Sequence, residues 1–98
     1  MITRVCALDI YGTVLDSEDV DNAMPVRDGF QVFVRNCQKS KILLVSISDQ
    51  PEINVKLDLD KPFRKAKLSI DIFNRYYQLT TIPKDVRQIL QDYRLTPE

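Results

Sequence analysis

Two continuous apolar runs stand out in the first half of the chain. The first lies within residues 3–10, where four apolar residues precede Asp9, and the second spans residues 42–47. Unbroken apolar runs of this length are typical of parallel strands that are buried on both faces. Serine, aspartate and proline, which are residue types that end strands, follow the second run. Each run therefore predicts a strand.

A helical stripe separates the two runs. Between residues 27 and 39, apolar side chains recur at positions i, i+3, i+4 and i+7, which places them on one face of a helix. They are Phe30, Phe33, Val34 and Cys37. Asp28 near the start and Lys39 at the end match the polarity of the helix dipole. The order strand, helix, strand predicts a βαβ unit with parallel strands.

Residues 51–70 carry two conflicting signals. Apolar residues alternate with a period of two, which favours a strand. These residues are Ile53, Val55, Leu57 and Leu59. Pro51 and Glu52 instead favour the start of a helix. Both alternatives stay open at this point.

The last third of the chain adds a second apolar cluster and a second helix. The cluster spans residues 70–79, and residues 83–93 repeat the helical stripe, with Pro83 suited to the first turn. Together with the βαβ unit, these elements predict an α/β fold, a three-layer sandwich with a parallel sheet, as a single domain over residues 1–98.

Composition narrows the range of functions. The 98 residues contain no His, which excludes imidazole bases and His metal ligands within this chain. Lys+Arg and Asp+Glu both number 14, so the basic excess typical of a nucleic-acid-binding protein is missing. No run approaches the ~18 apolar residues of a membrane span. Cys6 and Cys37 lie in apolar patterns typical of free thiols in a reducing compartment. We expect a cytoplasmic protein with no nucleic-acid or membrane partner.

The chemically informative segment follows the first predicted strand. Asp9 stands at the carboxyl end of that strand, where open α/β sheets place their ligands. Gly12 permits a sharp turn beneath it, and Thr13 is placed to hydrogen-bond the turn or the carboxylate. A carboxylate presented in this way is suited to nucleophilic catalysis. The alternative is an aspartate that only ends a strand and begins a turn.

This segment resembles the first signature of the haloacid dehalogenase superfamily, in which an apolar strand is followed by Asp-x-x-Gly-Thr, an apolar pair and a further Asp. Asp9, Gly12, Thr13 and Asp16 occupy these positions. The resemblance is clear over residues 3–48 and weaker beyond them. It implies a Rossmann-like core without a large inserted cap, in which Gly12 and Thr13 contribute to substrate binding.

The later signatures have partial counterparts. The apolar run that ends in Ser46 resembles the second signature, and Lys84 resembles the lysine of the third. Ser46 is equally suited to cap the next turn. Lys61-Pro62 also resembles the Lys-Pro dipeptide of the superfamily, which favours the alternative that Lys84 is a solvated lysine at a helix start. The fourth signature, a strand ending in Gly-Asp or Asp-Asp, has no counterpart, which indicates either a truncated chain or a degraded metal site.

The resemblance implies a mechanism and a cofactor. Asp9 would be the nucleophile and form an aspartyl intermediate, Ser46 would hydrogen-bond the transferred group, and Lys84 would neutralise charge near the nucleophile. Mg²⁺ would be held by the Asp9 carboxylate, the backbone carbonyl of Tyr11 and a later acid, for which Asp49 is the substitute available here.

Tyr11 departs from the superfamily pattern at a catalytic position. Phosphatases of this superfamily usually carry a second Asp two residues after the nucleophile, as general acid, and here that position holds a phenol. A phenol with its ordinary pKa near ~10 is a poor proton donor at neutral pH, and loss of a general acid costs about 10²–10⁴ in rate. The form Asp-x-Tyr-Gly-Thr looks more like the dehalogenase branch, although residues 14–26 are too few for the cap of that branch.

The leading expectation is a Mg²⁺-dependent hydrolase that uses Asp9 on a small phosphorylated substrate. One alternative is a catalytically inert member or fragment that serves as a binding or assembly module, which predicts a homo-oligomer because a sheet edge and apolar helix faces stay uncovered. A further alternative is dehalogenase-like attack on carbon.

Overall fold

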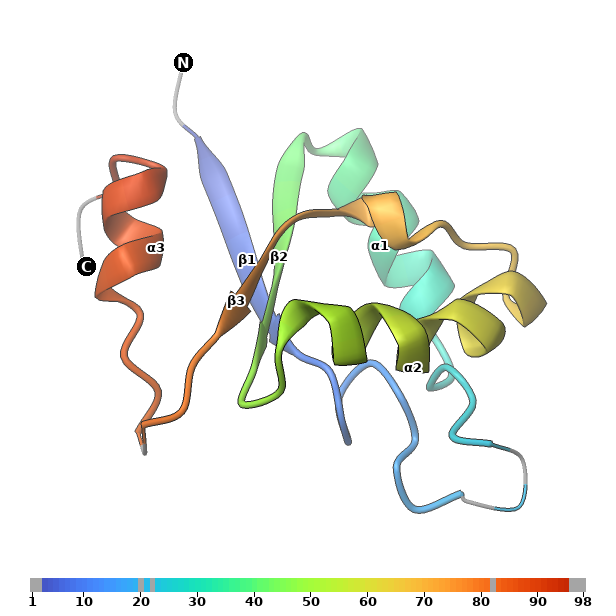
Figure 1. Cartoon of the computed structure of the whole chain (residues 1–98). Helices are drawn as coiled ribbons and strands as arrows, with labels where there is room; N and C mark the ends of the chain where they lie inside the picture. Colours follow the sequence, from blue (N-terminus) through green and yellow to red (C-terminus); the bar gives the residue numbers. More distant parts are fainter. Residues whose placement is uncertain (1–2, 20, 22, 82, 96–98) are drawn as a thin grey trace.

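The computed structural model describes residues 3–19, 21, 23–81 and 83–95. Within them the chain forms a small α/β domain with a three-stranded sheet and three α-helices (Figure 1). In chain order the elements are β1 (Arg4–Asp9), α1 (Phe30–Lys39), β2 (Ile42–Ser48), α2 (Glu52–Lys65), the 3-10 turn η1 (Ile70–Ile72), β3 (Phe73–Gln78) and α3 (Arg87–Asp92).

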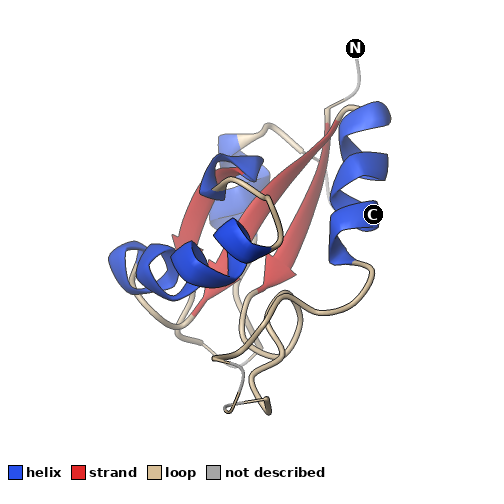
Figure 2. Cartoon of the chain, turned by 90° about the vertical axis from the view of Figure 1, so that its right-hand side faces the viewer, coloured by secondary structure: helices blue, strands red, loops and turns tan. Residues whose placement is uncertain are grey.

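The three strands are parallel and adjacent in the order β1-β2-β3. Asp9 at the end of β1 lies opposite Ile47, and Ser48 at the end of β2 lies opposite Gln78. The carboxyl ends of the strands therefore meet at one end of the sheet, toward which the arrowheads point in Figure 2. The predicted βαβ unit with parallel strands is confirmed.

The segment with conflicting signals is a helix. In α2, Val55 and Leu59 are 1% and 0% exposed, whereas Ile53 and Leu57 are 66% and 68% exposed. The two buried residues are four positions apart, the spacing of one helix face. The apparent period of two arose because apolar residues also occupy the exposed face of α2, where packing does not require them.

Two predicted helices begin later than expected, and one strand was not predicted. α1 begins at Phe30 because Gly29, immediately before it, adopts a left-handed conformation with φ of 87°. α3 begins at Arg87, so Lys84 lies in the connection that precedes the helix. The second apolar cluster contains η1 and the strand β3.

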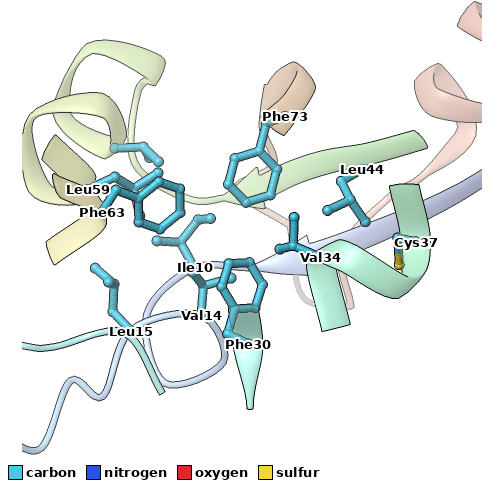
Figure 3. Packing of buried hydrophobic residues seen from close by; sticks show 11 residues of the cluster. Ile10, Val14, Leu15, Phe30, Val34, Cys37, Leu44, Leu59, Phe63 and Phe73 are labelled. Atoms are coloured by element: carbon cyan, nitrogen blue, oxygen red, sulfur yellow. The ribbon is translucent and has the colours of Figure 1, made fainter. Parts of the chain in front are cut away.

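The main hydrophobic core fills the space between the sheet and the helices α1 and α2 (Figure 3). Three aromatic rings form its centre. The ring centroids of Phe30 and Phe63 are 6.1 Å apart, and those of Phe63 and Phe73 are 6.2 Å apart. Cys37 is buried in this core and Cys6 is half-buried beside it, both as free thiols. Burial raises the pKa of both thiols, so both are protonated packing groups at neutral pH.

α3 lies on the opposite side of the sheet from α1 and α2 (Figure 1). Its attachment to β3 is largely polar. The Tyr77 hydroxyl donates a hydrogen bond to Asp92 Oδ2 at 2.7 Å, and the Arg75 guanidinium lies 3.2 Å from the same oxygen. The Tyr93 hydroxyl donates to Asn74 Oδ1 at 2.5 Å. No helix in the described parts of the chain is long and apolar enough to cross a membrane.

Candidate active site

The end of β1 is held by a tight turn. The Ile10 carbonyl accepts hydrogen bonds from the backbone N–H groups of Val14 and Leu15, each at 2.9 Å. These three side chains are almost fully buried, so the turn is anchored in the core. Gly12, inside the turn, has a φ of 85°, a conformation that disfavours any side chain. The turn thereby leaves Asp9 at the carboxyl end of the sheet, with its side chain 49% exposed.

Asp9 forms an ion pair with Lys84. The Lys84 Nζ atom lies 2.5 Å from Asp9 Oδ1, and the lysine side chain is 29% exposed. The two residues are 75 positions apart in the sequence. The connection between β3 and α3 brings the lysine to the end of β1. The structure therefore brings together the carboxylate and the ammonium that the sequence singled out. Among the described residues, no hydrogen bond to Asp9 Oδ2 accompanies this contact, so that oxygen is available to a ligand.

Tyr11 points its hydroxyl toward α2. The hydroxyl donates a short hydrogen bond to Asp58 Oδ2 of α2. Burial raises the pKa of Tyr11 well above its ordinary value, and the carboxylates of Asp58 and Asp49 raise it further. The Tyr11 phenol is therefore neutral, and its proton is donated to Asp58. Asp58 was not singled out by sequence reasoning, because nothing in its spacing connects it with residue 11.

The two serines of β2 have different environments. Ser46 is 1% exposed, and its Oγ atom has no hydrogen-bond partner within the described residues. Ser46 pairs in register with Leu8, before the end of β1. Ser48 is the last residue of β2, and its Oγ accepts a hydrogen bond from Gln50 N at 3.1 Å. The sequence singled out Ser46 as a site residue, which stays a prediction. The serine that ends β2 is Ser48, as the continuation of the strand pattern through Ile47 indicates.

Thr13 lies in the turn after β1, and Arg27 contacts this turn. The Arg27 guanidinium donates a hydrogen bond to the Gly12 carbonyl at 2.7 Å and so holds the turn in place. Thr13 is exposed and lines a shallow hollow of about 340 Å³. The hollow is otherwise lined by Leu8, Arg27, Asp28, Gly29, Phe30 and Phe33. Thr13 thus borders a partly apolar hollow, and the hydrogen bond from Arg27 to the turn was not expected from the sequence.

The expected Mg²⁺ site at Asp9, the Tyr11 carbonyl and Asp49 stays a prediction. No group of three or more His, Cys, Asp or Glu side chains within residues 3–19, 21, 23–81 and 83–95 is placed to hold a metal ion. One oxygen of Asp9 is already paired with an ammonium, and Asp49 is an exposed residue of the turn after β2. The Asp9 carboxylate and the Lys84 ammonium are therefore the groups on which the proposed chemistry depends.

Comparison with protein-family models, with curated proteins and with solved structures found no match to this chain. The functional assignment therefore depends on the geometry around Asp9.

Proposed function

We propose that this protein is a phosphohydrolase with the three-layer α/β core of the haloacid dehalogenase superfamily, in which Asp9 is the nucleophile and Lys84 neutralises the charge of the substrate phosphate. The observation that carries the proposal is the 2.5 Å contact between Asp9 Oδ1 and Lys84 Nζ at the carboxyl end of a parallel sheet. Ligands of open α/β sheets bind at this end, and a carboxylate nucleophile needs a nearby cation before it can approach an anionic phosphate.

The two oxygens of Asp9 have separate roles in this proposal. Lys84 holds Oδ1 and so fixes the orientation of the carboxylate. Oδ2 attacks phosphorus, the bond from Oδ2 to phosphorus forms, and the bond from phosphorus to the leaving-group oxygen breaks. The leaving group takes the electron pair of that bond. Lys84 offsets the negative charge on the phosphoryl oxygens, because phosphoryl transfer depends mainly on positioning and charge neutralisation.

Water completes the cycle. It attacks the phosphorus of the aspartyl phosphate, the bond from Oδ2 to phosphorus breaks, and the Asp9 carboxylate is restored. The proton lost by the attacking water passes to solvent, since the Asp9 side chain is 49% exposed. Ser48, Gly12 and Thr13 are the residues we assign to contacts with the transferred group, because they border the end of β1 or follow it directly.

Hydrolysis of p-nitrophenyl phosphate, with and without added Mg²⁺, tests the proposal. Asp9→Asn should abolish turnover, because an amide is not a nucleophile toward phosphorus. Lys84→Met should lower turnover by a factor of about 10² or more. Lys61→Met, which removes an exposed lysine of α2, is the matched control and should keep the wild-type rate. Turnover that survives in Asp9→Asn would overturn the assignment of the nucleophile.

The open edge of β1 favours a second candidate function. β1 is the first strand of the sheet, and the described residues pair only one of its two edges. In the binding or assembly alternative, the chain binds a partner or a second copy through this edge and has no turnover. A stable oligomer at micromolar concentration, with no hydrolysis of phosphate esters, would favour it. Release of halide from a 2-haloacid would instead favour attack on carbon.

A further inference from the structure

We propose that the site selects phosphate compounds whose leaving group departs without a proton, namely aryl and acyl phosphates, and discriminates against alkyl phosphates. This inference rests on the proposed function and adds the substrate class to it. It comes from the placement of two donor groups, the Tyr11 hydroxyl two residues after Asp9 and the Lys84 ammonium in contact with Asp9.

The first donor is the hydroxyl of Tyr11. It stands two residues after the nucleophile, but the proton of its hydroxyl is directed to Asp58 Oδ2 on α2. Donation to a departing oxygen near Asp9 would require Tyr11 to break this bond and leave the Asp58 carboxylate without its partner. Burial and the adjacent carboxylate also raise the pKa of Tyr11, which weakens the phenol further as an acid.

The second donor is the ammonium of Lys84. Its contact with Asp9 Oδ1 at 2.5 Å directs it toward the nucleophile rather than toward a leaving group on the far side of phosphorus. In-line displacement places the attacking and departing oxygens on opposite sides of the phosphorus atom. A group that holds the attacking carboxylate is therefore badly placed to protonate the departing oxygen.

The chemistry that follows is unassisted departure. When the bond between phosphorus and the leaving-group oxygen breaks, that oxygen keeps both electrons and leaves as a phenolate or a carboxylate. No proton is consumed in this step. An alkoxide is a much stronger base, and its departure without general-acid help forgoes an acceleration of about 10²–10⁴. Without general-acid help, the rate also falls steeply as the leaving group becomes more basic.

A series of substituted phenyl phosphates, together with acetyl phosphate and glycerol phosphate, tests this inference. We expect log kcat/KM to fall steeply as the phenol becomes less acidic, turnover of acetyl phosphate, and a rate on glycerol phosphate at least about 10²-fold below that on p-nitrophenyl phosphate. Tyr11→Asp should flatten the dependence and raise the rate on glycerol phosphate. Tyr11→Phe should keep the steep dependence. Tyr77→Phe, which removes a comparable tyrosine–aspartate bond at α3, is the control.

The outcomes separate this inference from the proposed function. Equal wild-type rates on aryl and alkyl phosphates would overturn the selectivity and leave the phosphohydrolase intact. A Tyr11→Phe protein that loses most of its rate on weakly acidic leaving groups would show that the phenol is a proton donor, which also overturns it. A complete lack of turnover on aryl and acyl phosphates would overturn the proposed function itself. If acetyl phosphate alone is turned over, the substrate class narrows to acyl phosphates.

Discussion

The two faces of the sheet are built differently. On the side of α1 and α2, 11 buried residues form one continuous hydrophobic cluster (Figure 3). On the side of α3, Val45 and Ile89 are buried outside this cluster, and hydrogen bonds and an ion pair with Asp92 join the helix to β3. The contacts of the sheet with α1 and α2 stabilise the fold, whereas the connection between β3 and α3 carries Lys84 to the candidate site. The connection that carries Lys84 therefore leads into a helix that polar contacts join to the sheet.

The largest expected effect is on the apolar face. Phe63 is 1% exposed and its ring contacts both Phe30 and Phe73. Phe63→Ala should lower the free energy of unfolding by about 3–5 kcal/mol, because it removes apolar contacts and leaves a cavity. Urea denaturation measures this loss. Phe33→Ala, at a position 38% exposed, is the control and should cost much less. Equal losses at the two positions would contradict the assignment of the core.

Acid should release α3 before it disturbs the apolar face. Hydrogen bonds from Tyr77 and Gln88, together with the charge of Arg75, lower the pKa of Asp92. A carboxyl group with a lowered pKa in the folded state stabilises that state fully above the ordinary value of about 3.9, and this contribution is lost as the pH falls below it. NMR chemical shifts of α3 against pH measure the release.

Asp92→Asn provides the comparison for this acid release. In that variant the chemical shifts of α3 should change less with pH, because the carboxylate that titrates is absent. Asp60→Asn, in α2 on the other side of the sheet, should leave the acid dependence of α3 unchanged. If α1 and α2 lost their structure at a higher pH than α3, the contrast between the two faces would be wrong.

A smaller effect is expected from the bond between Tyr77 and Asp92. Tyr77→Phe should speed amide exchange in α3 by a factor of about 2 to 10, the loss expected for one hydrogen bond. Burial, followed by the bond to Asp92, raises the pKa of Tyr77 to about 12. The neutral phenol therefore stabilises the fold fully below about pH 10, and this contribution is lost as the pH rises toward about 12. Ultraviolet titration of tyrosine in wild type and Tyr77→Phe measures this shift, and an ordinary pKa at Tyr77 would contradict the bond.

The smallest effect, and one of opposite sign, is expected at Ser46. Its hydroxyl is buried without a partner in the part of the chain that the structure describes. Ser46→Ala should leave stability unchanged or raise it by about 1 kcal/mol, because a buried polar group without a hydrogen bond is unfavourable. Ser48→Ala should instead destabilise, since Ser48 Oγ accepts a bond from Gln50 N. Thermal unfolding distinguishes them, and a large loss in Ser46→Ala would show that its hydroxyl does have a partner.

The first half of the fold could be predicted because each of its elements satisfies one clear pattern. In α1 the buried residues lie on one face, and in β2 the residues 44–46 are buried in succession. β1 forms where its apolar run predicts a strand, but its residues are half-buried or exposed rather than buried on both faces. The start of α1 was placed too early because the effect of Gly29 depends on its φ of 87°, which composition does not reveal. The parallel pairing followed from the order of the elements alone.

The second half required tertiary information. α2 carries the apolar residues Ile53 and Leu57 on its exposed face, so local periodicity misrepresents the buried face. β3 begins with buried Phe73, but Asn74 and Arg75, which follow it, are exposed. Such a strand is recognisable only when β2 is already beside it. Whether these segments form a helix or a strand therefore depends on the elements that pack against them.

The proximity of Lys84 to Asp9 was expected from the sequence, whereas the contact of Tyr11 was not. Asp9 and Lys84 were singled out by sequence, and the structure places them 2.5 Å apart. The bond from Tyr11 to Asp58 depends on how α2 packs against the turn, and no spacing rule anticipates it. The catalytic roles of these residues stay predictions, which the assays described above address.

The ion pair between Asp9 and Lys84 has a consequence for the order of assembly. The contact joins two residues that are 75 positions apart in the sequence and so closes a long loop of the chain. Most of the hydrophobic residues lie before Lys84 in the sequence and can collapse without it. In a refolding time course, burial of Phe63 should therefore precede formation of the contact between Asp9 and Lys84, and the delay would measure how slowly the connection before α3 closes.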